Sequence, residues 1–207
     1  MIHELSLRWG QSIADTLNTE EKAATYALGL ELIIIQGISL VVILGLAAAL
    51  GLMKTTLLFL AIFIPFRIWG GGPHLASFAC CLPVSCILIL GPAWGAAAAI
   101  WPSPVLAGAA GAGLLLGVWA VARWVPADTE KYPITDPQVR RQRKRIMARC
   151  LLLWSMATGF CFLQAYGTAA QALVAGAGIS LLLMSPAGYT LMGFIDKIFE
   201  KEEGEAA

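Results

Sequence analysis

Residues 82–122 read LPVSCILILGPAWGAAAAIWPSPVLAGAAGAGLLLGVWAVA, which is 41 positions without one Asp, Glu, Lys or Arg. Two further uncharged runs, 32–53 and 150–195, are 22 and 46 residues long. At ~20 residues per helical crossing, the shortest run fits one crossing and each longer run fits two. The apolar residues are continuous instead of alternating, which excludes a transmembrane β-barrel. With 58% hydrophobic residues and a mean hydropathy of +0.76, the sequence predicts an all-α, polytopic membrane bundle.

Breaks in the long runs divide the chain into about six hydrophobic segments. Trp101-Pro102-Ser103-Pro104 interrupts one run and the polar stretch 164–171 interrupts another, and such residues favour turns at the membrane edge. Thr55 to Phe66 is only twelve residues before Arg67, so this segment is a full crossing only if Ile68 and Trp69 extend it. The expected spans are 28–52, 55–69, 83–100, 105–123, 148–165 and 171–194.

The N-terminal segment, 1–27, has the pattern of an amphipathic helix and lacks the positive patch and apolar core of a signal peptide. Its large apolar residues recur at steps of three and four, on one helical face: Ile2, Leu5, Trp9, Ile13 and Leu17. This pattern predicts a helix lying in the membrane interface. We expect one membrane domain over 28–195 to follow, and a charged C-terminal tail over 196–207.

Basic residues are concentrated in one loop, 124–149, and at its border. Eight of the fourteen Lys and Arg residues lie between Arg123 and Arg149. By the positive-inside rule this loop is cytoplasmic, and anionic lipids are enough to explain its charge. Two crossings separate the loop from the segment around 70–81, so both are expected on the same side of the membrane.

Few residues offer chemistry. The only histidines are His3 and His74, so a multi-histidine metal site is excluded, and no phosphate-binding or nucleophile-elbow motif is present. The five cysteines are an odd number in apolar surroundings, and we expect no structural disulfide. What remains is the segment Arg67-Ile-Trp-Gly-Gly-Gly-Pro-His74-Leu-Ala-Ser-Phe-Ala-Cys80-Cys81, which holds a base beside a nucleophile at a membrane edge.

Helix geometry tests this pair. If Pro73 opens a helix, Cys81 lies about −20° from His74 around the axis and Cys80 about −120°, which favours Cys81 as the partner. Seven residues nevertheless separate the two backbones by about 10.5 Å along a straight helix. We therefore expect a bent or re-entrant segment over 67–81. The glycines before Pro73 permit unusual backbone angles and could offer N–H groups to an oxyanion.

The pattern of Arg67, Gly71-Gly72-Pro73-His74 and Cys81, followed by two hydrophobic segments and by Val125-Pro126-Ala127-Asp128-Thr129-Glu130-Lys131-Tyr132-Pro133-Ile134, resembles the accessory gene regulator protein B (AgrB) family. The resemblance covers nearly the whole chain. It implies a multi-pass protein of the bacterial cell membrane, a cysteine endopeptidase that matures an AgrD-like quorum-sensing propeptide.

The resemblance also implies roles for particular residues. His74 and Cys81 match the catalytic pair, and Arg67 and Gly72 match the arginine and glycine that precede it, with Gly71 beside them. The propeptides of the family carry an acidic tail, for which the basic residues Lys131, Arg140, Arg141, Arg143 and Lys144 are candidate binding residues. The expected product is a thiolactone formed through a Cys81 thioester. A homodimer is also implied; no cofactor, metal or nucleic acid is expected.

Less specific interpretations stay open. Taken without the resemblance, His74 and Cys81 are more simply packing residues, as Cys80, Cys86, Cys150 and Cys161 are expected to be. Arg67 alone would be explained equally well as an interfacial anchor. A second functional class is a membrane peptide exporter or a non-enzymatic partner. The absence of evident repeats and the uncharged runs argue against a transporter.

Overall fold

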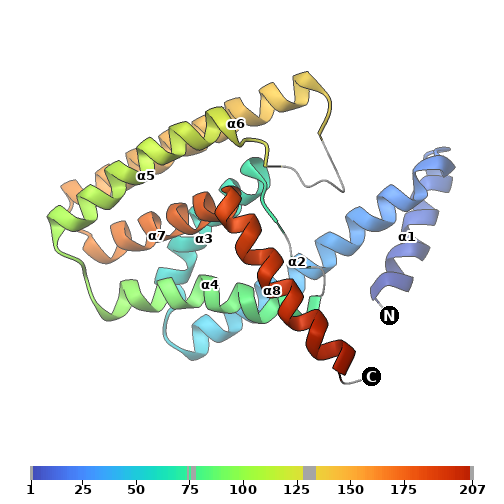
Figure 1. Cartoon of the computed structure of the whole chain (residues 1–207), viewed down its shortest axis with the longest axis horizontal. Coiled ribbons are helices and arrows are strands. Elements are labelled where there is room, and N and C mark those ends of the chain that lie inside the picture. The colour runs from blue at the N-terminus through green and yellow to red at the C-terminus, as the bar shows by residue number, and fades with distance from the viewer. Residues whose placement is uncertain (1, 74, 76–77, 128–133, 206–207) are drawn as a thin grey trace. The chain divides into compact units, whose positions relative to one another are not determined.

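The computed structural model describes residues 2–73, 75, 78–127 and 134–205, and it is helical almost throughout (Figure 1). The elements are α1 (Ile2–Thr16), the 3-10 helix η1 (Glu20–Lys22), α2 (Ala23–Ala49), α3 (Met53–Gly70), α4 (Phe78–Ala98), α5 (Ser103–Arg123), α6 (Pro137–Leu163), α7 (Gly167–Met184) and α8 (Pro186–Glu205). The described residues contain no strand, and their one extended pairing is an isolated parallel bridge between Gly71 and Ala127. The predicted all-α fold is confirmed.

The chain forms two compact units, Met1–Leu46 and Ala47–Ala207. In the first unit α1 packs on α2 through small residues. Ser6 and Ala14 are fully buried, and a Cβ on Gly10 would lie 2.6 Å from the backbone nitrogen of Ala27. The large apolar face predicted for α1 points away from this contact: Leu5, Trp9, Ile13 and Leu17 are all exposed. The helix is present but shorter than predicted, because it ends at Thr16 instead of continuing to residue 27, and its apolar face is exposed as a helix in a membrane interface requires.

In the second unit α7 runs along α3 at very short range. A Cβ on Gly176 would lie 2.6 Å from the carbonyl oxygen of Phe59, so only glycine allows this approach. Helices α5 and α6 lie side by side over the same pair (Figure 1). Trp154 of α6 is 1% exposed, and its indole N–H donates to the carbonyl oxygen of Leu173 at 3.0 Å. The core of the second unit therefore combines close helix contacts at glycine with large buried side chains such as Trp154, Phe59 and Phe66.

Six of the helices are long and apolar enough to cross a membrane: α2, α3, the 80–98 part of α4, α5, α6 and α7. The protein is therefore a multi-pass membrane protein, as predicted. The doubtful segment 55–69 is part of the unbroken helix α3, which has 18 residues and extends to Gly70. The predicted breaks at 101–104 and 164–171 are confirmed, because α4 ends at Ala98 and α6 ends at Leu163.

Several boundaries were predicted wrongly: α2, α4, α6 and α7 begin at Ala23, Phe78, Pro137 and Gly167, earlier than the expected 28, 83, 148 and 171. The last span does not continue to 194, because α7 ends at Met184 and a new helix begins at Pro186. Ser185 caps this new helix, since its hydroxyl accepts the Gly188 N–H at 3.2 Å, and proline is favoured as the first helical residue. The basic segment 124–149 is not all loop either. Its second half begins α6, where the Asp136 side chain accepts the N–H of Gln138 at 2.7 Å.

Candidate active site

Arg67 lies in the last turn of α3 and binds the backbone that follows the helix. Its Nη1 donates to the carbonyl oxygen of Gly71 at 3.0 Å, and its Nη2 donates to that of Pro73 at 2.8 Å. A guanidinium group holds two acceptors in a fixed planar geometry that an ammonium group cannot reproduce. The side chain is half-buried, so Arg67 is bound to the protein itself and is more than an interfacial anchor.

The segment after α3 needs its glycines. Gly71 has φ 90° and Gly72 has φ 123°, in the region that disfavours any residue with a Cβ. A Cβ on Gly71 would collide with the carbonyl oxygen of Ala127, and a Cβ on Gly72 would collide with Arg67 Nη1. Glycine at position 71 therefore leaves room for the Ala127 carbonyl group, and glycine at position 72 leaves room for the Arg67 guanidinium group.

Ala127 pairs the segment with the chain that follows α5. Its N–H donates to the carbonyl oxygen of Gly70 at 2.7 Å, and its own carbonyl oxygen accepts the N–H of Gly72 at 2.9 Å. The same carbonyl oxygen also accepts the hydroxyl of Tyr189, from α8, at 2.9 Å. Three elements distant in sequence thus meet at one residue.

The bridge leaves the glycine N–H groups occupied. The Gly71 N–H donates to the carbonyl oxygen of Arg67 at 3.1 Å, and that of Gly72 donates to Ala127. Pro73 has no N–H. In this arrangement both glycine N–H groups already donate to protein carbonyl oxygens, so an oxyanion would have to displace them.

Cys81 lies in the first turn of α4 and is half-buried, with its sulfur 3.9 Å from the hydroxyl of Ser85. The charge of Arg67 is within electrostatic reach of this thiol. Cys80, one position earlier, is 6% exposed and belongs to an apolar cluster with Leu75 and Met192. Cys80 therefore packs inside this cluster, whereas Cys81 packs against its edge and is more exposed.

The chain forms no helix at Pro73, which is the start that the helical wheel assumed. Pro73 and Leu75 are not helical, and α4 begins at Phe78. A helical wheel from 73 to 81 therefore does not apply. The bend predicted between His74 and Cys81 falls in part on residues outside those that the structure describes. His74 and Lys131 lie outside the residues that the structure describes.

The basic residues at the start of α6 divide into two groups. Lys144 Nζ donates to the carbonyl oxygen of Ala122 at 2.9 Å, and Arg143 Nη1 reaches that of Ile68 at 3.5 Å, so these two residues join α6 to the ends of α5 and α3. Arg140 donates to the carbonyl oxygen of Ile134 at 3.0 Å. Arg141 is exposed. The start of α6 therefore lies next to the end of α3, through Arg143 and the carbonyl oxygen of Ile68.

Sequence reasoning missed two residues of this region. Ala127 has no reactive group, and its importance arises from its backbone alone. Tyr189 was expected inside the last span, and only the Ser185-Pro186 pair, typical of a helix start, signals that the chain turns there. No three His, Cys, Asp or Glu residues cluster in the described part of the chain in a way that could hold a metal ion.

The fold and the site define a multi-pass membrane protein with a bent, arginine-held segment beside a half-buried thiol. A family model described as accessory gene regulator B matches residues 6–185. The chain belongs to this family, whose members process quorum-sensing peptides and act with an AgrD-type propeptide. Comparisons with curated proteins and with solved structures returned no match.

Proposed function

We propose that the protein is a membrane-embedded cysteine endopeptidase that cleaves the C-terminal part of an AgrD-like propeptide. Cys81 is the nucleophile and His74 is its base. The observation that carries the proposal is the half-buried Cys81 thiol at the start of α4, beside a segment that Arg67 holds in a conformation only glycine tolerates. Glycine adopts these angles without strain, so the conformation of the segment depends on Gly71 and Gly72.

Cys81 lies where positive charge surrounds it. The first turn of a helix is the positive end of its dipole, and the Arg67 guanidinium is the nearby cation. In the proposed first step His74 takes the thiol proton and the sulfur attacks a propeptide carbonyl carbon. The C–N bond then breaks, and the C-terminal fragment leaves as an amine with the proton from His74. The N-terminal fragment remains on Cys81 as a thioester.

Cyclisation follows as an exchange between thioesters. A thiol within the bound peptide attacks the same carbonyl carbon, the Cys81 thiolate leaves, and a thiolactone forms. One thioester replaces another, so this step needs little free energy, whereas direct conversion of an amide to a thioester is uphill. The intermediate must be kept from water, which the apolar cluster around Cys81 favours.

We further propose that the basic start of α6 binds the acidic tail of the propeptide. Arg141 is exposed and can reach a substrate directly. The other candidate binding residues are Lys131, Arg140, Arg143 and Lys144, and the last two also join α6 to neighbouring helices. The positive-inside rule supports a cytoplasmic position for this end of the bundle. The family resemblance is the support for a homodimer.

The test is intact-mass analysis of the propeptide co-expressed with the wild type, Cys81→Ala or Cys80→Ala. We expect loss of the C-terminal fragment with the wild type and Cys80→Ala, and uncut propeptide with Cys81→Ala. A further loss of one water from the retained fragment would report cyclisation. Uncut propeptide with all three, with the peptide still crossing the membrane, would refute the peptidase and favour the exporter.

A further inference from the structure

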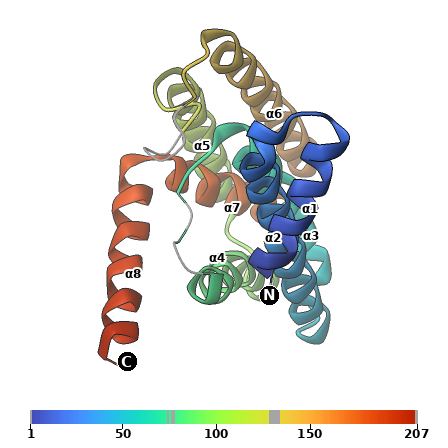
Figure 2. The same ribbon diagram turned by 90° about the vertical axis from the view of Figure 1, so that its right-hand side faces the viewer.

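Helix α8 lies beyond the region that the family model matches, which ends at residue 185, yet it contacts the candidate active site. It leaves the end of α7 at a steep angle (Figures 1 and 2). The turn between the helices is tight: a Cβ on Gly188 would lie 2.6 Å from the Cα of Leu183, and the Ser185 hydroxyl donates to the carbonyl oxygen of Leu182 at 2.6 Å. The direction of α8 is therefore set by its first turn.

One face of α8 is directed at the site. Tyr189, Met192, Ile195 and Phe199 follow each other at steps of three and four, which places them on a common face. Met192 is 5% exposed in the cluster that contains Cys80 and Leu75, and Ile195 and Phe199 pack against this cluster. Cys81, Val84 and Leu88 pack against it from α4.

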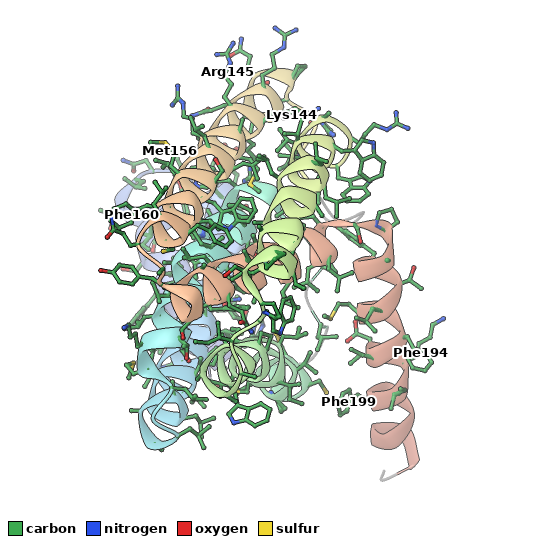
Figure 3. The ribbon with its side chains drawn as sticks, turned by 90° about the vertical axis from the view of Figure 1, so that its left-hand side faces the viewer. Lys144, Arg145, Met156, Phe160, Phe194 and Phe199 are labelled. Atoms are coloured by element: carbon green, nitrogen blue, oxygen red, sulfur yellow. The ribbon has the colours of Figure 1, made fainter. Side chains whose placement is uncertain are left out.

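The other face of α8 points outward. Leu191, Phe194 and Ile198 are exposed, and Phe194 is 63% exposed. Figure 3 shows Phe199 on the side of α8 toward α4, and Phe194 on the opposite side. Two phenylalanines on one helix thus form a matched pair, one at the site and one away from it.

A hydrogen bond from α8 reaches Ala127, the residue that pairs with the segment after α3. The Ala127 carbonyl oxygen accepts two hydrogen bonds, from the Gly72 N–H and from the Tyr189 hydroxyl, which occupies both of its lone pairs. Ala127 connects the segment that leads to Cys81 with the chain that leads to the basic start of α6. A residue that holds Ala127 in place therefore also sets the position of the basic start of α6, the candidate substrate-binding residues, relative to Cys81.

We infer that α8 contributes to the active site. Tyr189 is a positioning residue, because its hydroxyl holds Ala127 against the segment that follows α3. This inference rests on the proposed peptidase function and deepens it. The apolar residues of the same face, Met192, Ile195 and Phe199, close the site on the side of α8. The region that matches the family model therefore does not contain the whole of the site.

The first test uses Tyr189→Phe, which removes one hydroxyl and leaves the Gly72 hydrogen bond to Ala127. We expect kcat for propeptide cleavage, per folded enzyme in detergent micelles, to fall about 3- to 10-fold, the equivalent of one hydrogen bond. KM should change little. The control is Tyr166→Phe, since Tyr166 is exposed at the other end of α6 and should behave as the wild type. Cleavage by Tyr189→Phe at the wild-type rate would overturn the inference.

A double-mutant cycle separates positioning from a general structural effect. Gly71→Ala disrupts the bridge to Ala127 directly, so in that background Tyr189→Phe should cost clearly less than in the wild type. Equal losses in both backgrounds would show that Tyr189 does not act through the bridge.

The matched pair tests the apolar face. We expect Phe199→Ala to reduce cleavage and Phe194→Ala to leave it unchanged, and equal activities would contradict a role for this face. An inactive wild type would refute the proposed function itself, whereas an active wild type with neutral Tyr189→Phe and Phe199→Ala would refute only the role of α8.

Discussion

Two ends of the second unit each use one long polar side chain to bind backbone groups that have no partner within a helix, and the proposed nucleophile Cys81 belongs to one of them. At one end, Gln171 of α7 accepts the N–H of Trp101 at 2.9 Å and donates to the carbonyl oxygen of Ala99 at 3.1 Å. At the other end, Arg67 donates to the carbonyl oxygens of Gly71 and Pro73. In both places the helix ladder stops and a side chain replaces the missing partners.

The two ends differ in what surrounds the polar side chain. Gln171 is 5% exposed, neutral and matched by backbone groups on both its oxygen and its nitrogen, so it closes a turn between two spans. Arg67 carries a charge, holds backbone at positive φ and lies within electrostatic reach of Cys81. Helix ends in a membrane need partners for their free backbone groups at both places, and what distinguishes the Arg67 end is a charged side chain together with the proposed nucleophile Cys81.

Among the variants that distinguish the two ends, Arg67→Lys is expected to reduce propeptide cleavage most. The lysine keeps the charge but cannot hold both carbonyl oxygens, and each charge-assisted hydrogen bond contributes ~1.5–3 kcal/mol. We therefore expect propeptide cleavage to fall by roughly 10- to 100-fold. The measurement is the cleavage rate per folded enzyme, and Arg123→Lys at the exposed end of α5 is the control. A rate equal to that of the wild type would show that charge alone is needed.

A smaller loss is expected for Gly72→Ala. The added Cβ meets Arg67 Nη1 and forces a non-glycine residue into a φ of 123°. Backbone strain of this kind costs ~1–3 kcal/mol, so activity and thermal stability should both fall. Gly91→Ala, in the exposed middle of α4 with nothing near its Cβ, should change neither. Equal behaviour of the two variants in a thermal unfolding series would contradict the described packing.

At the opposite end we expect Gln171→Leu to affect stability alone. The change leaves the Trp101 N–H and the Ala99 carbonyl oxygen without their partner, at a cost of ~1–3 kcal/mol. The midpoint of thermal unfolding should fall, and the cleavage rate per folded molecule should stay near that of the wild type. A selective loss of rate would break the distinction between the two ends.

The smallest effect is expected within the basic stretch. Arg141 is exposed, so Arg141→Gln should raise KM by about 2- to 5-fold at low salt, and the effect should shrink at high salt, as for other exposed charge pairs. Lys144→Gln also removes the bond to Ala122, so it should lower stability as well. A KM for Arg141→Gln that stays at the wild-type value at low salt would exclude this residue from substrate binding.

The sequence predicted the parts of the fold that depend on continuous apolar runs. The spans, the breaks at 101–104 and 164–171, and the N-terminal helix all follow from hydropathy and periodicity. It failed where one polar or capping residue decides, because Ser185 and Asp136 start helices inside segments whose composition indicated a longer span and a loop. Local hydrogen bonds override average hydropathy at such positions.

The site was predictable only in its reactive groups. Cys81 and Arg67 stand out because a thiol and an arginine are rare at such positions, and the glycines beside Arg67 signal an unusual backbone. Ala127 and Tyr189 could not be found in this way. They act through a carbonyl oxygen and one hydroxyl across 62 residues of sequence, and only the folded chain brings them together.

The most direct test of the central claim is to trap the acyl-enzyme. Purified protein mixed briefly with the propeptide and quenched in acid should gain the mass of the propeptide minus that of its C-terminal fragment, because one amide is exchanged for one thioester. We predict that this adduct maps to Cys81, is removed by hydroxylamine and is missing in Cys81→Ala. Cleavage of the propeptide by Cys81→Ala, or an adduct on another cysteine, would contradict the account.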